Sequence, residues 1–259
     1  LRASCQTSRD VRQEESIPAK KHACQSGCFR ARVESMMIVC ANSKGGVGKS
    51  TLATHLAVWL FDQGFQTALL DTDKQRSSSE WIAEVEPNIT VRVADTPEEC
   101  LCNAQELISS HDFVVGDAPG GLEDLSRTLL ILADLAVFPI SPSILDVRSV
   151  AGATQVLRYA QGINGGKPDG RLVLNKMKTR DTISHELREG ASKLGLQVAQ
   201  HIIRDLQAYR DAAQQGTVVG RFGRKGAQAA ADMDALFSEL VGDVVTNKQQ
   251  AGRQKVENG

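Results

Sequence analysis

The 259-residue sequence is poor in aromatic side chains, has almost no net charge and contains no long apolar run. Aromatic residues make up 4% of the chain, which argues against a single-stranded nucleic-acid platform built from stacked rings. The 30 Lys and Arg are balanced by 31 Asp and Glu, so a strongly basic DNA coat protein is excluded, although a local basic patch is not. The hydrophobic fraction of 41% excludes a chain that is disordered throughout.

The sequence pattern shows neither a membrane span nor a signal peptide. The longest apolar stretch, residues 129–140, is interrupted by Asp134 and Pro139, and it is shorter than the roughly 20 residues that a span needs. Residues 1–35 mix charges with Ser, Gln and Cys and lack an apolar core. We therefore expect a cytoplasmic protein without a membrane partner, associated with the nucleoid if it binds DNA.

Six cysteines are present, and three of them lie in the polar first 35 residues. His22, Cys24 and Cys28 could be read as metal ligands, but no second pair follows at the spacing of a zinc module. We expect reduced thiols instead, as is usual for the cytosol.

The chain changes character at Met36. Residues 1–35 have no sustained period of 2 or 3.6, and we expect them to be a disordered leader. Our hypothesis is that the natural product begins at Met36 or Met37 and that the leader comes from an over-extended start. At about 100–200 residues per domain, we expect residues 36–245 to form a single domain and residues 246–259 to be a frayed polar tail.

From Met36 onward, short apolar runs alternate with helical patterns. Near-continuous apolar strands separated by helices indicate a mostly parallel sheet covered on both faces. Right-handed crossovers make this a doubly wound, three-layer α/β fold, in which ligands bind beyond the carboxyl ends of the strands. The expected strands are residues 38–41, 67–71, 90–93, 113–117, 135–140, 172–175 and 198–203. The expected helices lie near residues 50–63, 77–84, 97–109, 123–132, 146–161, 182–194 and 227–245.

The run S-K-G-G-V-G-K-S-T, residues 43–51, follows the first expected strand and opens a helix. A phosphate-binding loop needs glycines that let backbone N–H groups face the phosphates, a lysine, a Ser or Thr hydroxyl for Mg²⁺ and a helix N-terminus. All are present in order, with Lys49 and Ser50 in the last two places. The general pattern has glycine where this chain has Ser43, and the chain adds Lys44 ahead of the glycines.

This K-G-G-x-G-K-[ST] variant resembles the deviant Walker A loop of the ParA/MinD class of ATPases, and most of all that of ParA-like partition ATPases. The resemblance extends from about Met37 to Val241 and implies a P-loop NTPase-like fold with ATP and Mg²⁺ as cofactors. It implies that Lys49 binds phosphate, that Ser50 binds Mg²⁺, and that Lys44 reaches the partner's nucleotide across an ATP-dependent homodimer, as an arginine finger does. The implied nucleotide-binding run is Lys44, Gly45, Gly46, Val47, Gly48, Lys49, Ser50 and Thr51.

Two acidic segments lie at the ends of expected strands. The run L-L-D-T-D-K-Q resembles the D-x-D-x-Q switch I of the family, with Lys74 where proline is usual. By resemblance, Asp73 orients the attacking water and Asp71 supports the Mg²⁺ shell. The run F-V-V-G-D resembles Walker B, with Asp117 holding a Mg²⁺-bound water, although Gly120 replaces a common proline beyond it. The alternative is that these carboxylates only cap loops and helices.

Two later strand ends are the candidate adenine edge. In the wider family these positions border the base, and here they carry Asn175 and the pair Arg204-Asp205. The Asn175 amide can hydrogen-bond a purine, and the backbone at the second strand end could do the rest. An asparagine that merely ends a strand remains the alternative for Asn175.

Positive charge gathers again toward the C-terminus. ParA-like ATPases bind DNA non-specifically as ATP dimers through this region, and Arg221, Arg224 and Lys225 are the best candidates here. A few phosphate contacts per monomer suit weak, salt-sensitive binding. The alternative is a solvated face with ordinary arginine pairs. The closing helix has an acidic polar face, which argues against a MinD-like membrane helix.

The resemblance implies a slow, Mg²⁺-dependent ATPase that forms ADP and phosphate, binds DNA non-specifically and serves plasmid or chromosome partition. A ParB-like partner that stimulates hydrolysis is expected. Three alternatives stay open: a ParA-like positioner of a protein complex that does not use DNA, an ATP-dependent metabolic synthetase on the same fold, and an iron–sulfur carrier. The last would need cysteines beyond Cys102, and the sequence has none.

Overall fold

A computed structural model describes residues 35–121, 124–142, 146–178, 188–192 and 196–257. The expected leader, with the cysteines and histidine weighed as zinc ligands, lies outside the described residues, and so does most of the helix expected near 182–194. Among the described residues, every helix is too short or too polar to span a bilayer.

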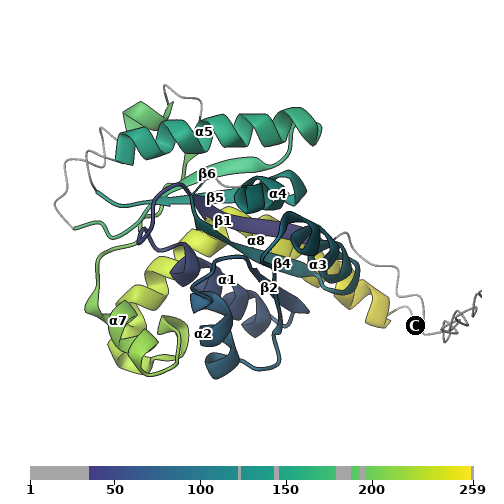
Figure 1. The fold of residues 1–259 in the computed structure, drawn as a ribbon. Coiled ribbons are helices and arrows are strands. Elements are labelled where there is room, and N and C mark those ends of the chain that lie inside the picture. The colour runs from purple at the N-terminus through teal and green to yellow at the C-terminus, as the bar shows by residue number, and fades with distance from the viewer. Residues whose placement is uncertain (1–34, 122–123, 143–145, 179–187, 193–195, 258–259) are drawn as a thin grey trace, which may run out of the picture. The chain divides into compact units, whose positions relative to one another are not determined.

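A seven-stranded, wholly parallel sheet forms the middle layer, in the order β3-β2-β4-β1-β5-β6-β7 (Figure 1). Its strands are β1 (Met36–Asn42), β2 (Thr67–Asp71), β3 (Thr90–Val93), β4 (Phe113–Gly120), β5 (Leu135–Ile140), β6 (Asp169–Leu174) and β7 (Gln197–Val198). The first strand, β1, lies at the centre of the sheet, with β4 on one side of it and β5 on the other. The carboxyl ends of β1, β2 and β4 therefore lie next to one another, as the doubly wound prediction requires.

Helices cover both faces of this sheet (Figure 1). One face carries α1 (Lys49–Asp62), α2 (Ser77–Val85), α7 (Gln207–Gln214), the short 3₁₀ helix η1 (Val219–Arg221) and α8 (Gly223–Glu257). The other carries α3 (Pro97–Ser110), α4 (Asp124–Leu132) and α5 (Asp146–Ile163). Successive β1 residues point to opposite cores, Val39 toward α3–α5 and Cys40 toward α1 and α8. Burial on both faces explains why the central strands β1 and β5 are nearly continuous apolar runs.

The last strand is shorter than expected. We predicted a strand over 198–203, but β7 covers only Gln197–Val198. Beyond β7 the N–H groups of Ala199 and Ile203 still donate to carbonyls of β6. Side chains bond other backbone groups of this segment: Arg188 donates to the carbonyls of Ala199 and Gln200, and Glu239 accepts the N–H groups of Gln200 and His201. The segment therefore stays beside β6, but charged side chains bond part of its backbone and the regular strand ends at Val198. The short α7 and η1 were not predicted at all.

The closing helix is longer than expected. We predicted that it ends near Val245 and leaves a frayed tail over 246–259, but α8 continues to Glu257. Lys248 extends the buried side of the helix: it is 7% exposed, and its ammonium lies 5.2 Å from the centre of the Phe113 ring. A lysine stem laid over an aromatic ring counts as apolar packing, which a polarity pattern does not reveal.

Candidate nucleotide site

The loop between β1 and α1 makes a tight left-handed turn. Gly46 and Gly48 have φ values of 74° and 98°, which favour glycine. A Cβ on Gly48 would lie 2.3 Å from Nδ2 of Asn175, so the position lacks room as well. The turn leads directly into the N-terminus of α1, where the helix dipole favours an anion.

Asn42, at the end of β1, anchors the loop from behind. It is 1% exposed, its Nδ2 donates to the Pro139 carbonyl at 2.6 Å, and its Oδ1 accepts the Lys44 N–H at 3.1 Å. The side chain thus ties the start of the loop to β5. This role was not predicted from the sequence, because an asparagine before a glycine-rich loop looks like an ordinary strand terminator.

Lys49 lies inside the site. It is 5% exposed, its Nζ donates to the Lys44 carbonyl at 3.3 Å, and it lines a cavity of about 570 Å³ together with Ser50 and Asp73. Burial lowers the pKa of Lys49, while Asp117 and Asp73 act in the opposite direction. An ammonium held in such a cavity is suited to bind a polyphosphate.

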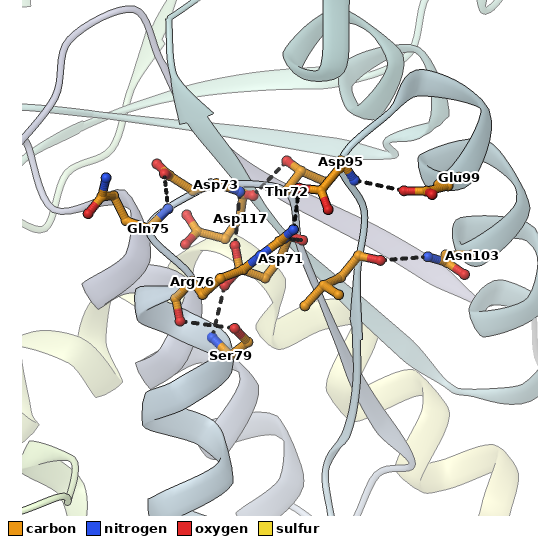
Figure 2. A network of polar contacts seen from close by, with 11 residues as sticks. Asp71, Thr72, Asp73, Gln75, Arg76, Ser79, Asp95, Glu99, Asn103 and Asp117 are labelled. Atoms are coloured by element: carbon orange, nitrogen blue, oxygen red, sulfur yellow. Dashed lines mark hydrogen bonds and ion pairs between the residues drawn. The ribbon is translucent and has the colours of Figure 1, made fainter.

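The two switch I carboxylates differ in what they contact (Figure 2). Asp71 is completely buried, and its oxygens accept the N–H groups of Asp73 at 2.9 Å and Ser79 at 3.0 Å. It therefore braces the turn into α2, the structural role that the sequence kept as an alternative, and its support of Mg²⁺ stays a prediction. Asp73 is only partly buried, accepts the Gln75 N–H at 3.0 Å and faces the 570 Å³ cavity.

Asp117, at the end of β4, is the most unusual group of the site. It is 0% exposed, and neither carboxylate oxygen has a hydrogen-bond partner among the described residues. Burial raises the pKa of Asp117 to about 7, with Asp71 adding to the rise and the nearby Ser50 and Ser78 hydroxyls and Lys49 opposing it. A buried carboxylate without a partner costs free energy that a bound cation would offset.

The donor set at Asp117 fits Mg²⁺. The Ser50 hydroxyl and the Asp117 carboxylate are hard oxygen donors, and Asp71 is close enough to act on Asp117 electrostatically. Within the described residues there is no cluster of three or more His, Cys, Asp or Glu that could bind a metal. Mg²⁺ in phosphate sites needs no such cluster, since phosphate and water supply most of its ligands.

A second cavity, of about 230 Å³, adjoins the first. Gly48, Thr51, Trp81 and Lys176 line both. The smaller cavity is also lined by Tyr209 and by all three predicted adenine-edge residues. Trp81 and Tyr209 offer the apolar walls that a base needs. Neither was predicted from the sequence, because single aromatic residues in helices carry no local signal.

The side chains of the predicted adenine edge are committed to the protein itself. Arg204 binds Asp232 through Nε and Nη2, both at 2.8 Å, and Asp205 pairs with Arg210 at 3.1 Å. Asn175 donates to the Val47 carbonyl at 2.7 Å and accepts the Lys176 N–H at 2.9 Å. These residues brace the cavity wall, and a direct contact with a base stays a prediction.

The predicted DNA residues fall into two groups. Arg221 pairs with Asp62 at 2.5 Å and with Glu86 at 3.0 Å, and it also donates to the Val85 carbonyl. Its guanidinium thus joins the ends of α1 and α2 to η1. Arg224 and Lys225 are exposed on the first turn of α8.

The family and the fold can be compared with those of known proteins. The sequence matches the CobQ/CobB/MinD/ParA nucleotide binding domain over residues 38–219. The maintenance of carboxysome distribution protein A of Halothiobacillus neapolitanus is 28% identical over 80% of this chain and 97% of its own length. The ATP complex of a variant of Cyanothece McdA has a TM-score of 0.66 and 16% identity, covering 81% of this chain and 97% of that one. The Mg-ADP complex of Pyrococcus horikoshii MinD has a TM-score of 0.60 and 19% identity, covering 77% and 94%. These likenesses confirm the predicted P-loop fold.

Proposed function

Because the chain belongs to the CobQ/CobB/MinD/ParA nucleotide-binding domain family, we propose that it is a Mg²⁺-dependent ATPase that dimerises on ATP and acts as a positioning switch. The observation that carries the proposal is the buried, unpartnered Asp117 beside Lys49, at the carboxyl ends of the central strands. Charges left unsatisfied in a fold mark a place where a ligand completes the structure.

Each residue of the site has a separate role in the proposed reaction. The N–H groups of the loop and the ammonium of Lys49 bind the β- and γ-phosphates, while Ser50 and Asp117 would hold Mg²⁺. Mg²⁺ when bound neutralises charge that develops on the phosphate oxygens. Asp73 orients the attacking water from the wall of the phosphate cavity. Lys44 contributes its cation to the partner's nucleotide, so that ATP binding favours the dimer.

The output of the switch is the placement of a cargo. The carboxysome-distribution relative, which this chain matches over 97% of the relative's length, favours a protein assembly as cargo. A partitioned plasmid or chromosome is the second candidate, supported by the fact that ParA belongs to the same family. In both cases we propose that the ATP dimer holds non-specific DNA through Arg224 and Lys225 and that a ParB-like partner stimulates a slow basal hydrolysis.

DNA binding is tested by gel shift on unrelated duplex DNA with ATP, with ADP and without nucleotide. We expect a shift with ATP that weakens as salt rises. The double variant Arg224→Ala with Lys225→Ala loses the shift, whereas the matched double variant Arg92→Ala with Arg253→Ala, which removes two exposed cations elsewhere, keeps it. Binding that ignores the nucleotide, or no binding at low salt, refutes the DNA-linked switch and leaves the DNA-independent positioner.

The chemistry is tested with Asp73→Ala. This variant retains ATP-dependent dimers in size-exclusion chromatography but stops turnover, because the carboxylate acts on water and not on the bound nucleotide. The exposed Asp124→Ala serves as the control and hydrolyses ATP as the wild type does. Full hydrolysis by Asp73→Ala would refute the assigned role.

A further inference from the structure

Two consecutive residues after β6 donate hydrogen bonds to the phosphate loop. Nδ2 of Asn175 donates to the Val47 carbonyl at 2.7 Å, and Nζ of Lys176 donates to the Gly46 carbonyl at 2.7 Å. The donors lie 128 and 130 positions away from their acceptors in the chain. Two neighbouring carbonyls of the loop are thus bonded by two neighbouring side chains.

These carbonyls are the part of the loop whose position decides how it binds anions. In a phosphate-binding loop the N–H groups turn inward, so the intervening carbonyls point outward and need partners. A carbonyl that rotates inward would present negative charge to the phosphates. Donors that hold Gly46 and Val47 carbonyls outward therefore keep the anion site in its binding conformation.

The Asn175 amide is fixed in orientation. It is 5% exposed, and its Oδ1 accepts the Lys176 N–H at 2.9 Å, so its Nδ2 must face the loop. The Asn175 N–H in turn donates to the Ile140 carbonyl at 2.7 Å, which ties the pair to β5.

The backbone of Lys176 is in an unusual conformation. Its φ of 57° lies in the left-handed region, which among the described non-glycine residues only Arg76 shares. Glycine adopts this conformation more easily, so a lysine in it points to a use for its side chain. The next residue, Met177, is held by hydrogen bonds to Ile203 and Asp205, so the turn is fixed on both sides.

We propose that Lys176 is a positioning residue for nucleotide binding, whose ammonium acts with the Asn175 amide to clamp the phosphate loop. Lys176 also lines both cavities, so its charge lies where the base and phosphate regions meet. The clamp rests on the ATP binding of the proposed function but is independent of DNA, cargo and partner. It adds a third lysine to the site, remote from the loop motif in sequence.

The test is equilibrium binding of Mg-ATP and Mg-ADP to Lys176→Ala, Lys176→Gly and Lys176→Arg, with Lys178→Ala as a nearby exposed lysine for control. We expect Lys176→Ala to raise both dissociation constants about tenfold, the effect of one lost charge-assisted hydrogen bond. Lys176→Gly removes the backbone strain but not the defect, Lys176→Arg restores most of the affinity, and Lys178→Ala binds normally.

Steady-state kinetics separate positioning from chemistry. Since the clamp acts on the loop before and during hydrolysis, Lys176→Ala raises KM and leaves kcat nearly unchanged. Three outcomes overturn the clamp: wild-type affinity in Lys176→Ala, full recovery in Lys176→Gly, or a loss for ATP with none for ADP, which would indicate a direct γ-phosphate contact. A wild-type protein that binds no nucleotide would refute the proposed function as well.

Discussion

The charged residues of the phosphate cavity and those around η1 and α8 are satisfied in opposite ways. At the cavity, Asp117 is buried without a partner and Lys49 is held in a partly desolvated position. Around α8, Arg204 is bound by Asp232, and Arg221 by Asp62 and Glu86.

This difference separates buried charges that the protein itself leaves without an ion pair from charges that join its helices. A paired arginine between helices stabilises the chain and has few free donors for DNA, while an unpaired buried carboxylate destabilises it until a cation binds. Counting cations along the sequence treated Arg221, Arg224 and Lys225 as equals. Of these three residues, Arg221 is held by Asp62 and Glu86 in the structure, whereas Arg224 and Lys225 are exposed on the first turn of α8.

The largest effect is expected for Asp117→Asn. ATP turnover falls about 100-fold or more because the carboxylate toward Mg²⁺ is lost. At pH 8 the free energy of unfolding in the absence of nucleotide rises by about 1–3 kcal/mol, since a buried unpartnered charge is removed. Turnover assays and urea unfolding check both, with exposed Asp124→Asn as the control. A variant that is both inactive and less stable than the wild type would show that Asp117 supports the fold and is not an unsatisfied buried charge.

His55 lies between the two regions, and we expect it to make the free energy of unfolding depend on pH. It is 3% exposed, bonds the Thr51 carbonyl through Nδ1 and accepts the Val219 N–H at Nε2, and burial lowers its pKa to about 4. The unfolded chain, with a histidine pKa near 6.5, therefore binds more protons between pH 6.5 and 4. Stability is lost as the pH falls through this window, by at most about 3 kcal/mol.

The measurement is urea unfolding at several pH values for the wild type and His55→Gln. The raised pKa of Asp117 has the opposite sign, because the folded chain keeps a proton up to about pH 7 that the unfolded chain has lost. In the wild type, the effects of His55 and Asp117 on the pH dependence of the free energy of unfolding therefore partly cancel. The difference between the wild type and His55→Gln isolates His55, and a pH-independent difference would show that His55 is not buried as a neutral ring.

An intermediate effect is expected for Arg221→Ala. The free energy of unfolding falls by about 1–3 kcal/mol, because Glu86, whose side chain is 11% exposed, loses its cation. ATP affinity stays within about twofold, since Arg221 lines neither cavity. Calorimetry and nucleotide titration measure the two quantities. A stable Arg221→Ala that loses only DNA binding would show that Arg221 acts as an exposed cation and not as a link between helices.

The smallest effect on stability is expected for Arg224→Ala combined with Lys225→Ala. Both side chains are exposed, so the free energy of unfolding changes by less than about 0.5 kcal/mol. A larger loss in urea unfolding would mean that these residues, like Arg221, support the fold, and the loss of a DNA shift could then not be assigned to direct contact.

Much of the site was predictable because its signals are local. The glycines, Lys49 and Ser50 occupy consecutive positions after an apolar strand, and Asp73 and Asp117 follow two more such strands. The ends of α8 and β7 were not predictable in the same way, since Lys248 packs on Phe113 and Glu239 captures the backbone after β7 across long sequence separations.

The sequence by itself determined the parallel α/β architecture, the phosphate loop and the acidic strand ends, because periodicity, glycine spacing and strand-end position are properties of neighbouring residues. Only the tertiary structure decided which charges are paired. Arg221 meets Asp62 from 159 positions away, and Lys176 meets Gly46 from 130. An electrostatic interaction depends on distance in space and on burial, and the fold alone sets both. The near balance of acidic and basic residues thus conceals a structure in which some charges join helices and others line a cavity at the carboxyl ends of the strands.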